Sequence, residues 1–379
     1  MPRPRSRTPW LDRVRALGLE VAAEDEDGGL TLRHAAAQGL VVHVARVRRS
    51  DGWEWHVTAR HPDAPRDLRL VPESSANRVR KLFVGEDILT GDPDFDETVY
   101  IAGDEVATLG LLTAAVRDQI RALIEQGRVE GGAVEWRERS DEAQPVALLA
   151  RIGWVMRLAR TLAVQTDRFG RLLRMARTDR RAECRLRALE VYLRHGGQLD
   201  EHARRHLLRD DDARVRLRVA RACAAVDALV ALAANVDPAV RGDALDALVG
   251  QTGDRVAAAF AAAAGDAPAI ARRGLLPCLD AEPALIDSLG EAALVVLLDG
   301  GGRRWRGEAA DRLGAIGTEA AVAPLARLAE TFFGGSEDKA RARAAIAAIT
   351  TRLGGLRAGG LTVVDVAPGA LSTVTPPDQ

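Results

Sequence analysis

The chain has few aromatic residues, almost no lysine and no long apolar run. Aromatic residues make up 4% of the 379 positions and hydrophobic residues 47%, so small aliphatic side chains must form most of the core. No apolar stretch approaches the roughly 20 residues of a membrane-spanning helix. Residues 1–8 lack the apolar segment of a secretory signal peptide. The composition therefore predicts a protein without a membrane partner.

Cysteine is also scarce. The three cysteines, Cys184, Cys223 and Cys278, lie far apart in the sequence and at apolar positions of predicted helices. This pattern favours buried free thiols and a reducing, cytoplasmic location. Lysine occurs only at Lys81 and Lys339, whereas arginine is abundant. The arginine, alanine and glycine content is typical of a GC-rich bacterial genome.

A helix-opening pattern at Asp237 recurs through the second half of the chain. Asp237 can accept hydrogen bonds from free amides at a helix N-terminus, and Pro238 suits the first helical position. An apolar face then follows at helical spacing, formed by Val240, Ala244, Leu245, Leu248 and Val249. The pattern predicts an amphipathic helix that packs against its neighbours.

The other copies also place an apolar residue and an arginine shortly after the helix start. The pairs are Cys184-Arg185, Val215-Arg216, Val240-Arg241 and Trp305-Arg306, whereas Ile270 is followed by Ala271. This pattern resembles the second helix of HEAT-like repeats. The arginines are 31, 25 and 65 residues apart, and the last spacing corresponds to about two units. These spacings indicate units shorter than the ~40–47 residues usual for HEAT repeats. The resemblance covers residues 146–354 and implies an all-α solenoid, but it implies no activity.

The first half predicts an α+β domain over residues 9–140, after a disordered basic arm at 1–8. A short helix is expected over Pro9–Gly18. Alternating apolar residues between turn-forming clusters predict strands near 19–21, 30–32, 40–47, 53–58, 68–71 and 133–136, with helices near 104–111 and 113–126. The segment Thr90-Gly91-Asp92-Pro93-Asp94-Phe95-Asp96 is similar to a turn found in uncharacterised bacterial domains, where it precedes a short strand and two helices. Residues 138–145 predict a hinge, and residues 360–375 a β-like tail.

Two groups of residues have the spacing of metal ligands, but neither completes a known motif. The acidic loop around Asp92, Asp94 and Asp96 lacks the glycine and the terminal glutamate of an EF-hand. His202 and His206 are four residues apart, but no glutamate follows His202 as in the zinc motif, and arginines flank both histidines. We therefore expect a capped turn and a basic helix, and no metal or cofactor.

Catalytic motifs are equally scarce in the sequence. Phosphate-binding loops ending in Lys-Ser/Thr, nucleophile elbows and dinucleotide-binding glycine motifs are missing. The run Gly300-Gly301-Gly302 is followed by arginines and follows a predicted helix. We therefore expect a protein that is not an enzyme.

Charge is distributed unevenly along the chain. Residues 151–222 carry 19 arginines and 9 acidic residues, a net charge of +10, although the whole chain carries −1. This basic segment could bind phosphates or an acidic protein surface. The candidate binding residues are Arg157, Arg160, Arg171, Arg174, Arg177, Arg180 and Arg181. Alternatively, the arginines of this segment lie on solvent-facing helix surfaces, pair with Asp210, Asp211 and Asp212, or pair with the acidic remainder of the chain.

The sequence thus favours a non-catalytic interaction scaffold that binds a protein partner through a HEAT-like solenoid surface. Stacked helical repeats offer extended surfaces that suit binding. The alternative is binding to the phosphate backbone of a nucleic acid through the basic first half of the solenoid. The basic segment has only Trp154, Phe169 and Tyr192 for base stacking, which makes unpaired nucleic acid the weaker candidate.

Overall fold

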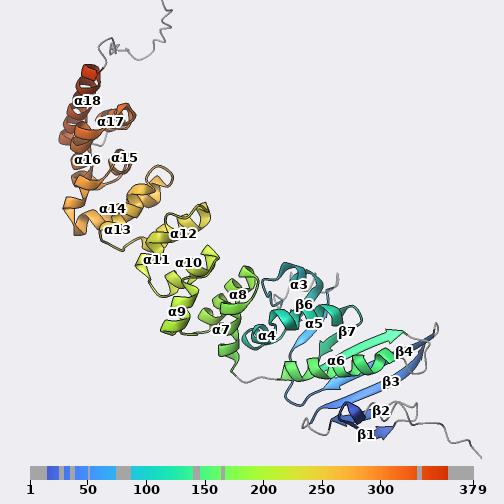
Figure 1. The fold of residues 1–379 in the computed structure, drawn as a ribbon. Helices are drawn as coiled ribbons and strands as arrows, with labels where there is room; N and C mark the ends of the chain where they lie inside the picture. Colours follow the sequence, from blue (N-terminus) through green and yellow to red (C-terminus); the bar gives the residue numbers. More distant parts are fainter. Residues whose placement is uncertain are drawn as a thin grey trace, which may run out of the picture. The chain divides into compact units, whose positions relative to one another are not determined.

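The computed structural model describes residues 15–24, 30–34, 39–49, 52–73, 87–139, 146–163, 167–330 and 335–356 (Figure 1). The chain divides into two compact units, Met1–Cys223 and Ala224–Gln379. The first contains an antiparallel sheet and several helices, and the described part of the second is helical. The domain boundary predicted between residues 140 and 146 falls inside the first unit. The predicted arm (1–8) and tail (360–375), and most of the predicted helix at 9–18, lie outside the described residues.

One antiparallel sheet of eight strands organises the first unit. Its strands are β1 (Leu19–Glu24), β2 (Leu30–His34), β3 (Val41–Arg49), β4 (Gly52–Arg60), β5 (Arg69–Pro72), β6 (Val99–Ala102), β7 (Gly127–Glu130) and β8 (Ala133–Arg139). Their order across the sheet is β1-β2-β3-β4-β8-β7-β5-β6. The predicted strands are confirmed. Strand β7 was not predicted, although the adjacent Gly131 and Gly132 both have positive φ, as a tight hairpin turn between β7 and β8 requires.

Helix α6 (Val146–Ala163) packs on β4 and β8 (Figure 1). The sheet presents an apolar face because its strands alternate: Val44 pairs with Val57, which also pairs with Trp136, and all three side chains are buried. On α6, Leu148, Ile152, Val155 and Met156 are buried. The sequence analysis assigned this helix to the start of the helical repeats, but its apolar face instead lies on the sheet.

Between β5 and β7 the chain forms α3 (Pro93–Thr98), β6, α4 (Glu105–Leu111) and α5 (Ala114–Ile124). The two predicted helices at 104–111 and 113–126 are thereby confirmed. The predicted turn at Asp92 is a short helix, because the Asp92 side chain caps it and Pro93 occupies its first turn.

The rest of the first unit is α7 (Arg168–Thr178), α8 (Ala182–Arg194), α9 (Glu201–Leu207) and α10 (Ala213–Ala222). Helix α7 packs on α8 and α9, and α10 packs on α8 and α9. Helix α4 packs on both α7 and α8. Gly110 permits this approach, because a Cβ atom there would lie 3.2 Å from the carbonyl oxygen of Arg168. The helix pair α4–α5 is therefore continuous with the helices that follow.

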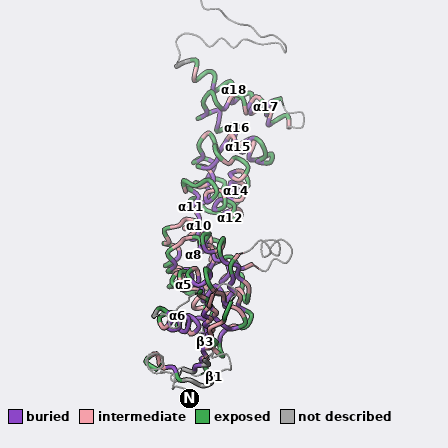
Figure 2. The backbone as a smooth tube through the Cα atoms, turned by 90° about the vertical axis from the view of Figure 1, so that its right-hand side faces the viewer, coloured by how far each residue is buried: buried purple, intermediate pink, exposed green. Residues whose placement is uncertain are grey.

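The second unit consists of consecutive helices. They are α11 (Val226–Leu232), α12 (Pro238–Leu248), α13 (Asp254–Ala262), α14 (Pro268–Ala281), α15 (Glu291–Leu298), α16 (Gly302–Ile316), α17 (Val322–Glu330) and α18 (Ser336–Leu356), with the 3-10 turns η1 (Pro283–Ser288) and η2 (Glu319–Ala321). Each odd-numbered helix packs on the next helix in the chain, and α11, α13, α15 and α17 also contact one another in series. Buried and exposed stretches alternate along the helices (Figure 2).

The three cysteines are free thiols, as the sequence predicts. Cys184 and Cys278 are buried and Cys223 is half-buried, and all three are free. Burial raises the pKa of the Cys184 thiol to about 12, so this sulfur is not a ready nucleophile. Within the described residues, no helix combines the length and apolar character needed to cross a membrane.

Candidate functional site

A fully buried arginine joins the sheet-proximal helices of the first unit to those that follow. Arg117, on α5, has a side chain with no exposed surface. Its guanidinium donates to both carboxylate oxygens of Asp179, at 3.0 and 3.1 Å, and to Asp92 Oδ2 at 3.1 Å. It also donates to the carbonyl oxygen of Leu112 at 2.9 Å. A buried arginine needs such complete pairing, since an unpaired buried charge is costly.

The loop that carries Asp92 is shaped by its own polar side chains. Asp96 accepts hydrogen bonds from the backbone amides of Thr90 and Gly91 and from the Thr90 hydroxyl, at 2.7–3.1 Å. Gly91 has a φ of +83°, and a Cβ atom there would lie 2.5 Å from the carbonyl oxygen of Glu183. Glycine is therefore required where this loop meets the start of α8. The distinctive sequence motif is explained by this docking.

The pKa values of Asp92, which is buried, and of Asp96, which is half-buried, shift in opposite directions. Burial alone would raise the pKa of Asp92, but the hydrogen bond from Arg117 and the charges of Arg121, Arg117 and Arg181 together lower it. For Asp96, burial outweighs the hydrogen bonds from Thr90 and Gly91, so its pKa is raised. The carboxylates considered as calcium ligands thus face arginines or backbone amides.

The turn before α8 recurs before α10 and α12. In each copy an Asp or Asn side chain accepts a hydrogen bond from the backbone amide two residues later: Asp179 from Arg181, Asp210 from Asp212 and Asn235 from Asp237. In each copy its carbonyl oxygen also accepts from an arginine six residues later: Arg185, Arg216 and Arg241. The sequence repeat therefore corresponds to a repeated local structure.

Several of these arginines also reach the next turn along the chain. Arg185 donates to both carboxylate oxygens of Asp210, at 2.7 and 2.8 Å. In the second unit, Arg241 pairs with Asp266 at 3.7 Å and Arg306 with Asp338 at 3.6 Å. Arg117 makes the equivalent contacts one step earlier, to Leu112 and Asp179. We call these four pairs, Arg117–Asp179, Arg185–Asp210, Arg241–Asp266 and Arg306–Asp338, the arginine rungs.

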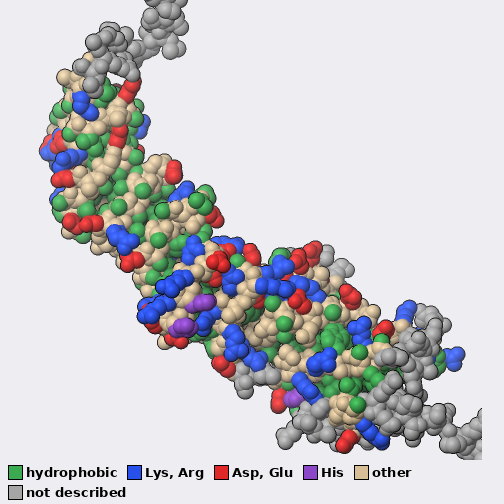
Figure 3. Space-filling view, viewed as in Figure 1, with side chains coloured by type: hydrophobic (Ala, Val, Ile, Leu, Met, Phe, Trp, Pro, Cys, Tyr) green, Lys and Arg blue, Asp and Glu red, His purple; other side chains and the backbone are tan. Residues whose placement is uncertain are grey.

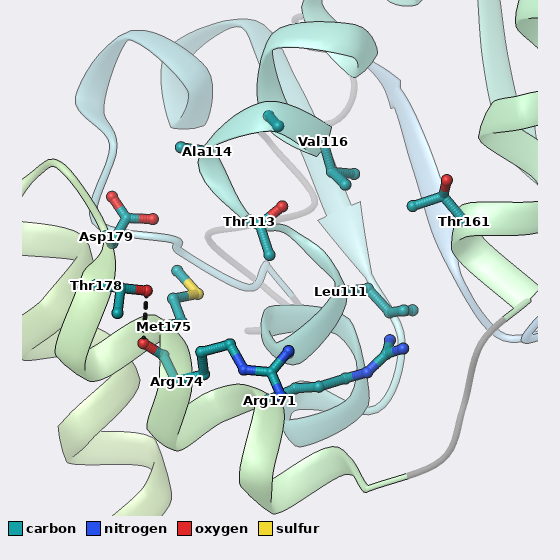
Figure 4. Close-up of a pocket in the computed structure, with 12 residues that line it drawn as sticks. Leu111, Thr113, Ala114, Val116, Thr161, Arg171, Arg174, Met175, Thr178 and Asp179 are labelled. Atoms are coloured by element: carbon teal, nitrogen blue, oxygen red, sulfur yellow. Dashed lines mark hydrogen bonds between the residues drawn. The ribbon is translucent and has the colours of Figure 1, made fainter. Parts of the chain in front are cut away.

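Two adjoining pockets lie along α7 in the first unit. The first has a volume of about 460 Å³ and is lined by residues of α4, α5, α6 and α7, among them Thr113, Thr161, Arg171, Arg174 and Thr178. In Figure 4 the side chains of Arg171 and Arg174 extend from α7 into it, across from Thr113. The polar lining of this pocket thus combines two guanidinium groups with three threonine hydroxyls.

The second pocket, of about 560 Å³, shares Thr178 and Asp179 with the first. It is lined by basic side chains from α7, α8 and the α9 region and by three aspartates, two of which, Asp179 and Asp210, pair with arginines of the protein. The basic residues are Arg177, Arg185, His202, Arg205, His206 and Arg209. Together the two pockets form a basic channel beside α7, which we call the α7 groove.

The seven arginines predicted from the sequence separate into three groups. Arg171, Arg174 and Arg177 line the α7 groove. Arg180 pairs with Asp118 at 2.8 Å, and Arg181 pairs with Asp94 at 2.5 Å and with Asp92 at 3.4 Å. Arg157 and Arg160 lie on α6. The structure therefore brings three of the seven together and pairs two others with aspartates of the α3 and α5 region.

Part of the positive charge is neutralised by the acidic first half of the same unit. Arg187, Arg194 and His195 all contact Glu105, at 2.8–3.1 Å. The alternative considered for the sequence, that these arginines pair with the acidic remainder, holds for this set and for Arg180 and Arg181. Basic and acidic side chains are interspersed over the face shown in Figure 3, where histidines lie among basic residues.

The two histidines at metal-ligand spacing both face Arg177. Arg177 donates to His202 Nε2 at 2.9 Å, and His206 Nε2 lies 3.3 Å from the Arg177 carbonyl oxygen, which accepts its proton. Because arginine can only donate, His202 Nε2 is the acceptor of this hydrogen bond. Across the described segments, no group of three or more His, Cys, Asp or Glu side chains is arranged to hold a metal ion.

The sequence analysis did not predict the buried contacts of Arg117 with Asp92, Leu112 and Asp179, which we call the Arg117 joint. The signal was present, because Val116-Arg117 has the same apolar-arginine order as Cys184-Arg185 and Val215-Arg216. No aspartate precedes it at the matching position, where Leu111 and Leu112 stand. The repeat predicted from the sequence therefore starts one helix pair after α4–α5. A scan against protein-family models finds no match for the chain, and a search of curated proteins finds no similar protein.

Proposed function

We propose that this chain is a non-catalytic interaction scaffold, in which short HEAT-like helix pairs form a solenoid that binds a protein partner. The observation that carries the proposal is the series of arginine rungs. Each rung ties an arginine of one helix pair to the turn of the next, as at Arg185 and Asp210. A structure assembled from such repeated neighbour contacts presents a long surface, which suits binding.

The packing in the second unit supports the same assembly. Helices α11, α13, α15 and α17 contact in series, and each also packs on the helix that follows it. This is the arrangement expected when helix pairs pile onto one another and each pair contacts only its neighbours. The first helix pair of the assembly is then α4–α5, which lies within the sheet domain.

Mixed charge on the described surface favours a protein partner. Ion pairs such as Arg255–Asp227 and Arg341–Asp311 place acidic and basic groups side by side on exposed helices. A polyanion with a charge every ~1.7 Å would meet these carboxylates as well as the arginines. A protein surface can match both signs.

Affinity capture with the full chain, followed by reconstitution from purified components, tests the proposal. We expect one partner to bind the purified chain at a fixed stoichiometry, and charge reversal on the exposed helical surface to weaken the complex. A chain that binds no protein in this assay, or that turns over a substrate at a defined site, would contradict the proposal.

The second candidate is binding to a nucleic-acid backbone, and Arg174 favours it. Arg174 lines the α7 groove and, among the described residues, forms no ion pair. Retention on a duplex DNA or RNA column that falls steeply with salt would support this candidate. Absence of retention at low salt would exclude it.

A further inference from the structure

We propose that the α7 groove is the site on this scaffold that receives an acidic segment of the protein partner. The inference rests on the proposed function and assigns a place and a chemistry to it. The ligand class is a peptide in an extended conformation whose aspartate or glutamate carboxylates lie two or three residues apart. Its recognition groups are the guanidinium groups of Arg171, Arg174 and Arg177.

The three arginines have the spacing of such a peptide. They are three residues apart on α7, so each step rises about 4.5 Å and the whole set covers about 9 Å along the helix axis. Two carboxylates that are two or three residues apart on an extended peptide are separated by about 7–10 Å. Such a pair can therefore span the distance from Arg171 to Arg177, with Arg174 between them, and a guanidinium group is well shaped for two hydrogen bonds to a carboxylate.

The acidic residues of the groove do not cancel its positive charge. Asp179 is already paired with Arg117, and Asp210 with Arg185. Arg205 pairs with Glu201 outside the lining. Arg174 forms no ion pair within the described part of the chain, and Arg177 donates to His202 Nε2. Asp211 also lines the groove, but among the described residues neither Arg174 nor Arg177 is paired with a carboxylate.

Hydroxyl groups complete the recognition surface of the first pocket. Thr113 and Thr161 line it from α5 and α6, opposite the arginines of α7. Thr113 precedes the first residue of α5 and makes no side-chain capping hydrogen bond there. The Thr113 hydroxyl can donate to a carboxylate that also contacts Arg171 or Arg174. The Thr161 hydroxyl already donates to the carbonyl oxygen of Arg157, at 2.9 Å, and can offer a ligand only its oxygen as an acceptor.

The composition of the groove selects a peptide over a nucleic acid. The residues that line the two pockets include no phenylalanine, tyrosine or tryptophan, so unpaired bases would find no stacking surface there. Asp211 lies in the second pocket, and Asp118 beside Arg180. A duplex backbone would bring phosphates against these carboxylates, whereas a peptide can place neutral or basic residues there.

Fluorescence anisotropy with the full chain tests this inference. The probe is a labelled 12-residue peptide with glutamate at alternate positions, compared with the same peptide carrying glutamine and with a labelled DNA duplex. We expect the glutamate peptide to bind, the glutamine peptide to bind at least about ten-fold more weakly, and the affinity to fall with salt. Stronger binding of the duplex than of the peptide would overturn the inference.

Two sets of substitutions locate the binding site. The triple variant R171Q/R174Q/R177Q removes the groove charges, and R255Q/R273Q/R303Q removes three exposed arginines of the second unit with the same change in net charge. We expect at least about a ten-fold loss for the first set and less than about a two-fold loss for the second. Equal losses of peptide affinity in the two triple variants would show that the peptide is attracted only by the overall charge. That result would overturn the assignment of the α7 groove as the binding site.

Folding of the variants is checked by circular dichroism, and the single variant R174Q, at an exposed position without an ion pair, provides a second test. We expect R174Q to weaken peptide binding while the spectrum stays unchanged. Unaltered binding would count against the groove. If the triple variant still binds the purified partner, the groove inference fails and the scaffold proposal stands; if the native chain binds no partner, the scaffold proposal itself fails.

Discussion

The arginine rungs differ between the two units of the chain. In the first unit, Arg117 and Asp179 are 0% and 1% exposed and 3.0 Å apart, and Arg185 and Asp210 are 13% and 6% exposed and 2.7 Å apart. In the second unit, Arg241 and Asp266 are 28% and 75% exposed and 3.7 Å apart. Arg306 and Asp338, also in the second unit, are 27% and 3% exposed and 3.6 Å apart. The same residue pattern thus gives short, well-buried pairs in the first unit and longer pairs with a partly exposed arginine in the second.

The difference indicates what each region depends on. In the first unit, the Arg117 rung joins α5 to the turn before α8 and to the Asp92 loop, and the Arg185 rung joins α8 to the turn before α10. These polar contacts fix how the elements dock. In the second unit, alanine and leucine side chains such as Ala244, Leu245 and Leu275 are completely buried. Helix packing there depends mainly on apolar burial, which is not directional. Substitutions at equivalent rungs should therefore have unequal effects.

The largest effect is expected for Arg117→Ala. The substitution leaves Asp179 and Asp92 buried without their main partner, and removal of one partner from a buried ion pair costs about 3–5 kcal/mol. We expect a loss of this size in the free energy of unfolding of the first unit, measured by urea denaturation with tryptophan fluorescence. Trp53, Trp55, Trp136 and Trp154 all lie in that unit.

Arg121→Ala is the matched control for this substitution. Arg121 also donates to Asp92, at 2.8 Å, but its side chain is 28% exposed and Asp92 keeps Arg117. The loss should therefore be clearly smaller. Equal losses of unfolding free energy in the two variants would contradict the view that the Arg117 rung stabilises the fold strongly because it is buried.

The next largest effect is expected for Gly91→Ala. An alanine at φ +83° is strained, and its Cβ atom would overlap the carbonyl oxygen of Glu183, a backbone atom that cannot turn away. We expect a loss of about 2–3 kcal/mol in the same unfolding assay. Gly196→Ala is the control, because Gly196 has the same φ of +83° and no atom within 4 Å of the added methyl group. If both variants lose the same amount, the contact with α8 contributes nothing.

Much of this fold could be predicted from the sequence, because its strands and helices carry strong local patterns. Alternation in Val41–Arg49 and Gly52–Arg60 identified two long strands, and apolar spacing after Asp237 identified α12. Strand β7 was missed because Gly127–Glu130 has a single apolar residue, Val129. Its place in the sheet is set by a glycine turn and by its neighbours.

The position of α6 and the Arg117 joint could not be read from local patterns. The apolar face of α6 has the same periodicity whether the helix packs on a sheet or on another helix, so the sequence does not name its partner. Arg117 and Asp179 are 62 residues apart, and a charged residue on a helix normally indicates an exposed face. Pairing over such a separation depends on the tertiary fold. The tertiary fold also decides which of the seven predicted arginines line the α7 groove and which pair with aspartates.

Arg185→Ala should have an intermediate effect. Its guanidinium makes two hydrogen bonds to Asp210 and one to the carbonyl oxygen of Asp179. Bonds to charged groups contribute about 1.5–3 kcal/mol, and the pair is only partly shielded from water, so we expect a loss of about 2 kcal/mol. Urea denaturation of the first unit measures it. A loss equal to that of Arg117→Ala would contradict the ranking by burial.

Acid should change the contributions of two carboxylates of one loop in opposite directions. The pKa of Asp92 is lowered in the folded protein, so its stabilising contribution is present above the unfolded pKa of about 3.9 and is lost as the pH falls through the folded value. The pKa of Asp96 is raised, so its contribution is present below the unfolded pKa and is lost as the pH rises through the folded value.

Unfolding of the Asp92→Asn and Asp96→Asn variants between pH 3 and 6 checks these signs. The stability lost in Asp92→Asn relative to the native chain should shrink as the pH falls, whereas the loss in Asp96→Asn should shrink as the pH rises. Parallel slopes for the two variants would show that the loop does not hold the two carboxylates in different environments.

The smallest effect is expected for Arg241→Ala, the equivalent rung in the second unit. Its pair with Asp266 is largely solvated, and exposed pairs contribute about 0–1 kcal/mol. The substitution also removes the hydrogen bond from Arg241 to the carbonyl oxygen of Asn235, at 3.1 Å. Hydrogen exchange of α12 and α14 measures the local change, which should not exceed about 1 kcal/mol. A loss as large as that of Arg185→Ala would mean that the rungs support both units equally, and apolar packing would then not be what distinguishes the second.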